Sequence, residues 1–186
     1  MPTLDLTNQF LIAMPSLEDP NFARTVTYVC AHNDEGAMGI VINRPLSIEL
    51  SEVFTQMELQ TDDPSLQVRT VFQGGPVHRD RGFVIHSPAQ DWGSTIQVSP
   101  EIGVSTSREI LVAIAKGEGP EELLVALGYA GWAAGQLEAE IAQNAWLSGP
   151  ANLEILFKAP PEHRWTQAAA HLGVDVARLS SDVGHA

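Results

Sequence analysis

Cysteine is nearly absent from this chain, because Cys30 is the single one among 186 residues. A lone cysteine cannot form an internal disulfide, and zinc sites that need several thiolates are excluded for the same reason. Long apolar runs are missing too, since none approaches the ~18–20 residues of a membrane-spanning helix. The N-terminus lacks the basic region and apolar stretch of a secretory signal. These absences predict a cytosolic protein that does not enter membranes.

Basic side chains are scarce as well. Ten Lys and Arg residues stand against 23 Asp and Glu residues, so the formal net charge is −13. Nucleic-acid affinity depends largely on Lys and Arg that neutralise phosphates, yet the densest basic window, "HRDR" at 78–81, contains an aspartate. No basic amphipathic helix suited to anionic membranes is recognisable. The composition argues against direct binding to nucleic acid or to membranes.

What is present is typical of a globular fold. Hydrophobic residues make up 44% and charged residues 18% of the chain, and its length suits one domain with a real core. Strand and helix patterns alternate irregularly along the chain. This irregularity favours an α+β fold over a regular βαβ array.

The first half of the chain predicts a hairpin, a helix and a second strand pair. Residues 25–43 are typical of a β-hairpin, because two β-branched runs flank the turn-forming "NDEG". Apolar residues then recur at helical spacing, at positions 50, 53, 54 and 57, and predict a short amphipathic helix within 47–57, with Ser47 as its N-cap. The runs 68–75 and 81–87 predict two strands that pair with each other around the bend "QGGPV".

The second half predicts further strands and helices. Thr106 and Glu109 have the spacing of a capping box at the start of a helix that Gly117 ends. After Val176 the chain is expected to fray. The expected elements are a strand at 95–98, a helix at 107–116, a buried strand at 121–130, a helix at 133–147, a strand at 152–158 and a helix at 160–173.

Four motifs of this sequence belong together: "EDPNFARTVTYVCAHNDEGAMGIVINRP", "QGGPV", "GYAGWAAGQLEAEI" and "NAWL". In order and spacing they resemble the bacterial AlgH/YqgE family, from about residue 8 to residue 173. The resemblance implies one α+β domain over residues 1–186, with a bent, barrel-like, mainly antiparallel sheet flanked by helices. The family is often labelled a transcriptional regulator, and no reaction is firmly attached to it. With this net charge, any regulatory effect is expected to be indirect.

The bend at Gly74, Gly75 and Pro76 has two interpretations. Glycines permit positive φ angles and close backbone approach, so the N–H groups of this bend could form an anion-binding nest. Alternatively, the bend is a structural turn between strands that the proline stiffens. The resemblance does not separate the two, and we favour the structural interpretation.

The stretch "GYAGWAAGQLEAEI" is a second candidate site. If strand, turn and helix follow in this order, Gly128, Gly131 and the helix N-terminus form a generic anion site. The glycine spacing fits neither a P-loop nor a Rossmann fingerprint, so no nucleotide or other cofactor is predicted. Tyr129, Trp132 and Gln136 could face a pocket or a partner. The alternative is that these residues pack the core and cap the helix.

Asn43 and Arg44 form the third candidate. The Arg44 guanidinium could hold a carboxylate or phosphate through two parallel hydrogen bonds. It could equally form a structural ion pair with Glu138 or Glu140, which the excess of acidic residues makes easy. The sequence leaves these two roles open.

Cys30 and His32 form the fourth candidate. On a regular strand from Thr25 the two side chains share a face, so an imidazolium at His32 could lower the pKa of the thiol if both are exposed. Cys30 would then be a reactive or redox-sensing thiol. The alternative is a small buried hydrophobic residue, which a lone cysteine on an apolar strand commonly is.

No catalytic or metal site is recognisable. His78 and His86 lack a carboxylate at fixed spacing, and no metal is predicted there. We therefore expect a non-catalytic module that binds a small ligand or a partner protein where "NRP", "QGGPV" and "GYAGW" converge in space. A thiol-based regulator acting through Cys30 ranks second. A transcriptional regulator acting directly on DNA ranks third because of the net charge.

Overall fold

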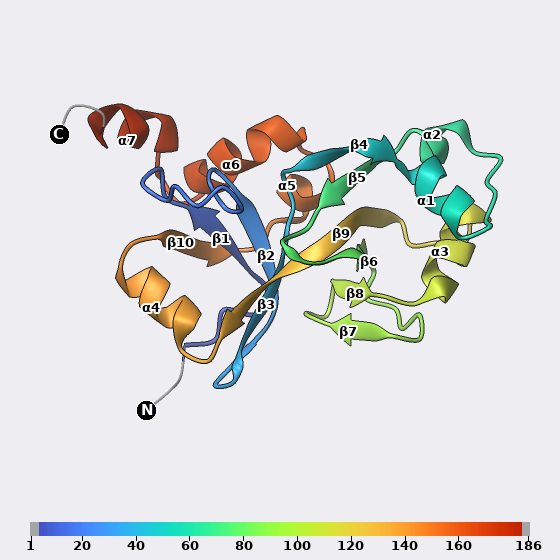
Figure 1. Ribbon diagram of the computed structural model, residues 1–186, viewed down its shortest axis with the longest axis horizontal. Coiled ribbons are helices and arrows are strands. Elements are labelled where there is room, and N and C mark those ends of the chain that lie inside the picture. Colours follow the sequence, from blue (N-terminus) through green and yellow to red (C-terminus); the bar gives the residue numbers. More distant parts are fainter. Residues whose placement is uncertain (1–3, 184–186) are drawn as a thin grey trace.

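The computed structural model describes residues 4–183, in which ten strands form one curled sheet with seven helices around it (Figure 1). The strand order is β10-β1-β2-β3-β9-β6-β8-β7, and β4 pairs with β5, which joins the sheet through β9. The elements are β1 (Gln9–Ala13), β2 (Val26–Asn33), β3 (Gly36–Val41), β4 (Pro45–Glu49), α1 (Leu50–Gln56), α2 (Pro64–Gln67), β5 (Thr70–Gln73), β6 (Val77–Ser87), β7 (Thr95–Gln97), β8 (Gly103–Ser105), α3 (Arg108–Ala115), β9 (Glu122–Ala133), α4 (Gln136–Ala142), β10 (Trp146–Pro150), α5 (Leu153–Phe157), α6 (Pro161–Ala170) and α7 (Val176–Val183).

Strand β9 is the axis of the fold and runs diagonally across the molecule in Figure 1. One of its edges pairs with β6 in antiparallel register. The other edge pairs first with β5, in the one parallel pair of the described sheet, and then with β3. Because β9 pairs with strands of both halves of the sheet, the chain forms one α+β domain. The sheet is bent and mainly antiparallel, as the family resemblance implies.

The core lies on both faces of the sheet. Alternate residues of β9 point to opposite faces: Leu124 and Ala126 pack in a cluster with Trp165 of α6, whereas Leu123 and Val125 pack against α1 and α3. Further along β9, Trp132 packs in a third cluster beside α4. Burial on both faces explains why β9 is almost continuously apolar.

Several predicted elements are confirmed. The hairpin is formed by β2 and β3, and α1 and α3 occupy the predicted helical segments. α6 begins at Pro161, which has no N–H to leave unpaired. Gly173 follows α6 with φ +75°, a left-handed conformation that suits glycine.

Both predicted N-caps are wrong. The N-cap of α1 is Glu49, which forms a capping box with Glu52, and not Ser47. α3 has Ser107 as its N-cap, without a side-chain cap bond, in place of the box that begins at Thr106.

One predicted helix is too long, and one predicted strand is of the wrong type. The segment 133–147 contains the helix α4, which ends at Ala142, and the start of the strand β10. The segment 152–158 is the helix α5 instead of a strand. The Asn152 side chain accepts the Ile155 N–H at 3.0 Å and so starts α5. A short apolar run cannot distinguish strand from helix by its periodicity. The tail that was expected to fray forms α7 up to Val183, and the rest of it lies outside the described residues.

The strands on either side of "QGGPV" do not pair with each other. β5 and β6 lie on opposite edges of β9, which separates them. The sequence suggested a hairpin because neighbouring strands usually pair. The connection between β5 and β6 therefore crosses over β9.

Candidate functional site

Two of the predicted motifs meet at this crossing. The Gly74 N–H donates to the Leu127 carbonyl at 2.7 Å, and the Gly74 carbonyl accepts the Val41 N–H at 2.8 Å. After Pro76 the chain reaches the far edge of β9, where Val77 pairs with Tyr129. The bend is thus bonded to strands on both sides, and the Gly74 N–H is already used within the fold.

The crossing brings two backbones into direct contact, and this explains the glycines. A Cβ added to Gly75 would lie 2.1 Å from the carbonyl carbon of Tyr129. A Cβ on Gly128 would lie 2.5 Å from the Gly75 carbonyl oxygen, and Gly128 has φ +80°. Neither position accepts a side chain. The structural interpretation of "QGGPV" therefore accounts for its glycines without a ligand.

Asn43 and Arg44 form hydrogen bonds with the backbone of residues 21–26, the segment that leads into β2. Arg44 Nη1 and Nη2 donate to the carbonyls of Asn21 and Ala23 at 2.8 and 2.9 Å. The Asn43 side chain accepts the Val26 N–H and donates to the Arg24 carbonyl, both at 2.9 Å. Arg44 forms neither of the ion pairs considered in the sequence, because carbonyl oxygens satisfy its guanidinium.

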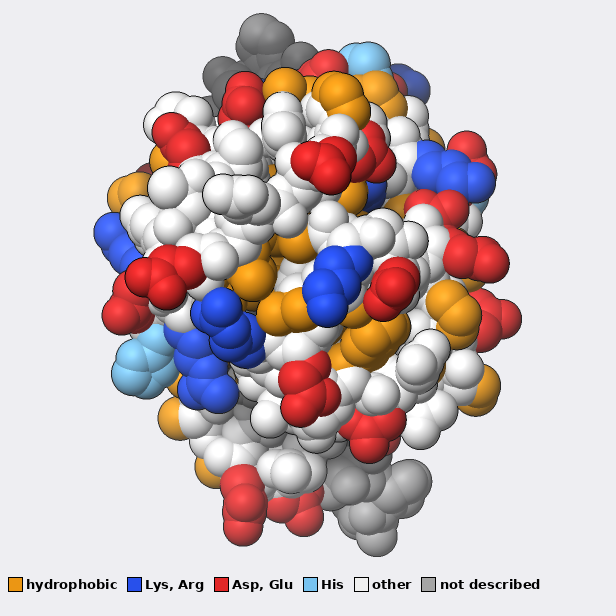
Figure 2. Space-filling view, turned by 90° about the vertical axis from the view of Figure 1, so that its right-hand side faces the viewer, with side chains coloured by type: hydrophobic (Ala, Val, Ile, Leu, Met, Phe, Trp, Pro, Cys, Tyr) orange, Lys and Arg blue, Asp and Glu red, His pale blue; other side chains and the backbone are white. Residues whose placement is uncertain are grey.

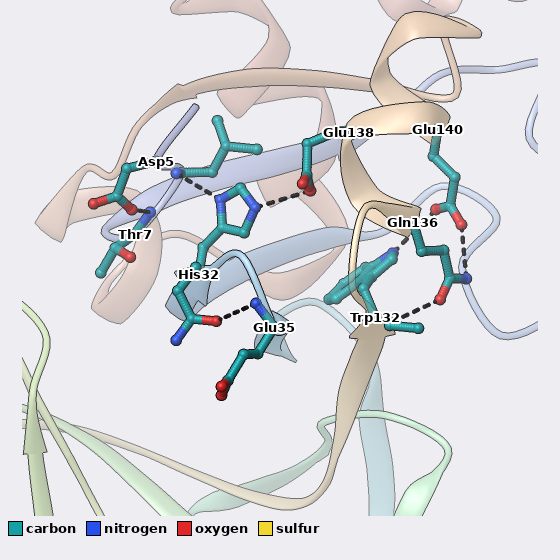
Figure 3. A network of polar contacts seen from close by, with 11 residues as sticks. Asp5, Thr7, His32, Glu35, Trp132, Gln136, Glu138 and Glu140 are labelled. Atoms are coloured by element: carbon teal, nitrogen blue, oxygen red, sulfur yellow. Dashed lines mark hydrogen bonds and ion pairs between the residues drawn. The ribbon is translucent and has the colours of Figure 1, made fainter. Parts of the chain in front are cut away.

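Trp132 and Gln136 belong to a network centred on Glu140 (Figure 3). Glu140 Oε1 accepts the indole N–H groups of Trp132 and Trp146 at 3.0 and 2.9 Å, and its Oε2 accepts from Gln136 at 3.0 Å. Gln136 also accepts the Ala133 N–H at 2.9 Å and so closes the turn before α4. The network fixes α4 against β9 and β10. Sequence reasoning did not assign Glu140 this role.

The remaining residues of this motif lie along β9 itself. The strand continues through Ala133, so Gly128 and Gly131 are strand residues and do not form a turn before a helix N-terminus. The Tyr129 ring packs edge-on against Phe83 at a centroid distance of 5.7 Å. The turn before α4 is formed by residues 134–135 instead of by Gly128 and Gly131.

Cys30 and His32 lie on opposite faces of β2 because of a β-bulge. The pairing of β2 with β3 shifts register between Val29 and Ala31, so the alternation of side chains changes phase at Cys30. Cys30 packs in the main core with 1% of its surface exposed, and burial raises the pKa of its thiol to about 12. His32 instead accepts the Leu6 N–H through Nδ1 at 3.0 Å (Figure 3).

His32 has a carboxylate partner on α4. Its Nε2 lies 2.9 Å from Glu138 Oε1, and this hydrogen bond is the main reason why the pKa of Glu138 is lowered (Figure 3). His32 therefore links the N-terminal segment to α4. The thiol hypothesis required an exposed Cys30 beside His32, and neither condition is met.

The two other histidines considered in the sequence do not come together. His86 is fully buried and its Nε2 lies 2.7 Å from Ser105 Oγ, while His78 packs against the Tyr129 ring. Burial lowers the pKa of His86, so its ring is held neutral among core residues. Residues 4–183 contain no group of three or more His, Cys, Asp or Glu side chains that could hold a metal ion.

A hollow of about 730 Å³ lies between α1, α3 and the sheet. Figure 2 looks onto this side of the molecule and shows hydrophobic side chains in a depression surrounded by many acidic and a few basic ones. We call it the α1–α3 groove. Its apolar floor and walls are Ile48, Val53, Met57, Leu111 and Leu127, and its other lining residues are Glu52, Thr55, Gln56, Asp80, Gly82, Thr106, Ser107 and Arg108.

Gly82 keeps the floor of this groove open. It lies on β6 opposite Leu127, and a Cβ added there would meet only Leu127 Cδ2, at 4.0 Å. Unlike Gly75 and Gly128, Gly82 is therefore not required by a close backbone contact. The groove draws its residues from several separate elements, so no local sequence motif indicated it.

No helix of the described part of the chain is both long and apolar enough to cross a bilayer. This agrees with the missing apolar runs noted in the sequence.

Comparisons with known proteins identify the family. The AlgH-like family model matches residues 10–177. A UPF0301 protein of Thioalkalivibrio sulfidiphilus is 59% identical over 182 residues, which cover 98% of this chain and 97% of the relative. A UPF0301 protein of Nitrosococcus oceani is 53% identical over 179 residues, or 96% of each chain.

Solved structures agree with this assignment. The solution structure of the AlgH protein from Pseudomonas aeruginosa matches with a TM-score of 0.81 at 50% identity and covers 97% of this chain and 95% of that one. A crystal structure of a protein from Corynebacterium diphtheriae matches with a TM-score of 0.71 at 18% identity, over 92% of this chain and 89% of that one, and shares the fold. The resemblance seen in the sequence is confirmed, and the chain belongs to the AlgH-like, or UPF0301, family.

Proposed function

We propose that this protein is a non-catalytic cytosolic module that binds a basic, amphipathic segment of a partner protein in the α1–α3 groove. The observation that carries the proposal is the open apolar floor between Met57 and Leu127, which Gly82 leaves unfilled. Apolar grooves between helices commonly receive the apolar face of an amphipathic helix. Val53 and Met57 are only partly buried, and methionine adapts its shape to different apolar partners.

Charge decides the kind of partner. Glu52 and Asp80 line the groove against a single cation, Arg108, and acidic side chains are spread over much of the visible face, with basic ones at one edge of the depression (Figure 2). The whole chain carries a net charge of −13. Such a field attracts a cationic segment and repels an acidic one. The partner therefore combines apolar residues with Lys or Arg.

The two other functions receive less support. A thiol regulator needs an accessible thiolate, which the burial of Cys30 prevents. Direct binding to DNA still conflicts with the net charge. A regulatory role would therefore act through the bound partner.

Filling the groove tests the proposal. We expect a fluorescent amphipathic peptide of Leu and Lys to bind the wild-type protein, as measured by anisotropy, and Gly82→Leu to weaken that binding at least about tenfold. The leucine side chain takes the space of one buried apolar side chain of the peptide, which is worth about 1.5–3 kcal/mol. Gly82→Ala, which adds a Cβ with open space around it, should bind within about twofold of wild type.

Two controls separate the groove from general attraction between opposite charges. A peptide in which Glu replaces every Lys should not bind. Urea unfolding of Gly82→Leu should match the wild type, so that lost binding is not lost folding. Equal affinity of wild type and Gly82→Leu for the Leu–Lys peptide would refute the groove as the binding site.

A further inference from the structure

A second cleft, of about 260 Å³, gathers basic side chains at the opposite edge of β9 from β6. It is lined by Arg69, Lys158 and Arg164 and by apolar residues that include Phe72, Leu156 and Pro160. Three of the ten basic residues of a strongly acidic chain thus face one cleft. We call it the arginine cleft.

Arg164 is a buried cation that forms no ion pair with a carboxylate of the described residues. Only 5% of its surface is exposed. Its Nε donates to the Ala159 carbonyl at 3.0 Å, its Nη1 donates to the Ile42 carbonyl, and its guanidinium lies 5.0 Å from the centre of the Phe72 ring. These partners orient the guanidinium but carry no net charge.

Arg69 adds a second guanidinium beside it. Its Nη2 donates to the Leu123 carbonyl at 2.6 Å. Burial, and after it the positive charge of Arg69, lowers the pKa of Arg164 to about 10. Within residues 4–183 the ion pairs are His32–Glu138 and Lys158–Glu122, so neither arginine has a carboxylate within 4.0 Å. Glu122 and Glu162 act on Arg69 and Arg164 only from further away.

Hydrogen-bond donors remain free on both side chains. Arg164 Nη2 and Arg69 Nε and Nη1 have no hydrogen-bond partner among the described residues. Each of these atoms keeps some solvent exposure, because the fully buried side-chain atoms without a partner among the described residues are Thr27 Oγ1 and Trp92 Nε1. Two guanidinium groups with free N–H donors are the arrangement that recognises oxyanions.

We propose that the arginine cleft binds the phosphate group of a small organic molecule. Partial burial of like charges is costly unless an opposite charge offsets it, and a phosphate supplies up to two negative charges and several acceptor oxygens. Phe72, Leu156 and Pro160 provide an apolar wall for the organic part. Arg164 also ties α6 to the end of β3, but this structural role does not explain why Arg69 and Lys158 accompany it.

Inorganic phosphate serves as the probe in thermal unfolding and in ³¹P NMR of the full chain. We expect phosphate to raise the melting temperature by about 5 °C near saturation, well above the effect of sodium chloride or acetate at the same ionic strength, and to show a broadened ³¹P line. Both effects should disappear in Arg69→Gln and weaken in Lys158→Gln, whose side chain is 60% exposed and tolerates the change. Lys116→Gln removes the same charge at an exposed position outside the cleft and should behave as wild type.

The same measurements on wild type and variants can also refute the proposal. Phosphate also stabilises proteins by exclusion from their surface, and such an effect would be equal in wild type, Arg69→Gln and Lys116→Gln. Acetate as effective as phosphate would refute the preference for a dianion. Gly82→Leu should leave phosphate binding unchanged, because the arginine cleft and the α1–α3 groove share no lining residue.

Discussion

Replacing Gly75 with alanine is expected to reduce the free energy of unfolding by at least about 3 kcal/mol. The new Cβ would lie 2.1 Å from the Tyr129 carbonyl carbon and 2.2 Å from its oxygen. Both atoms belong to the backbone of β9, which cannot shift without disturbing its pairs with β3 and β6. The overlap cannot be relieved by a change of rotamer.

Urea unfolding of matched alanine variants measures this effect. Gly82→Ala is the control, since it places the same methyl group on the neighbouring strand β6 where only Leu127 lies within 4.0 Å. It should change the unfolding free energy by no more than about 0.5 kcal/mol. If Gly75→Ala were as stable as Gly82→Ala, the crossing of the two backbones would be looser than the structure shows.

Alkylation of Cys30 in the native protein is expected to be slower by at least about a thousandfold than in the urea-unfolded chain. The thiol is buried and its pKa is raised to about 12, so a reagent must wait for the protein to open. The native rate should not show a thiolate inflection between about pH 5 and about pH 10. His32→Ala should not bring the inflection back, because His32 lies on the other face of β2. Fast labelling with a half-point near neutral pH would restore the thiol hypothesis.

The raised pKa of Cys30 also has a consequence for stability. The unfolded thiol ionises near pH 8.5, whereas the folded thiol keeps its proton to about pH 12. Above pH 8.5 the unfolded state therefore binds fewer protons than the folded state, and the contribution of Cys30 to stability declines as the pH rises through this range. In urea unfolding at increasing pH, Cys30→Ala should lack this part of the decline.

The sequence predicted the parts of the fold that depend on local patterns. β2 and β3 have β-branched runs around a four-residue turn, and α6 has a proline at its start and a glycine past its end. Local patterns could not show that β5 and β6 each pair with β9 instead of with each other. This arrangement depends on β9, which lies far along the chain and inserts between them.

The predicted site shows the same division. Contacts do bring the three motifs together: the Gln73 N–H donates to the Arg44 carbonyl at 2.8 Å, and Gly75 touches the backbone of Gly128 and Tyr129. The residue types of these motifs are compatible with ligand binding and with a close crossing of two backbones. The close contacts of Gly75 and Gly128 show that the glycines are needed for the crossing. The β-bulge at Cys30 changes which residues of β2 share a face, and no residue type in this segment predicts a bulge.

The position of β9 also constrains the order in which this protein forms during synthesis. β5 and β6 leave the ribosome well before β9, and each must keep an edge unpaired until residues 122–133 appear. The sheet is completed by insertion of a late strand between two early ones, which makes its contacts long-range and its folding slow for its size. A nascent chain that ends before β9 exposes two unpaired strand edges, which can pair with other chains. Such intermediates are the ones that chaperones protect from aggregation.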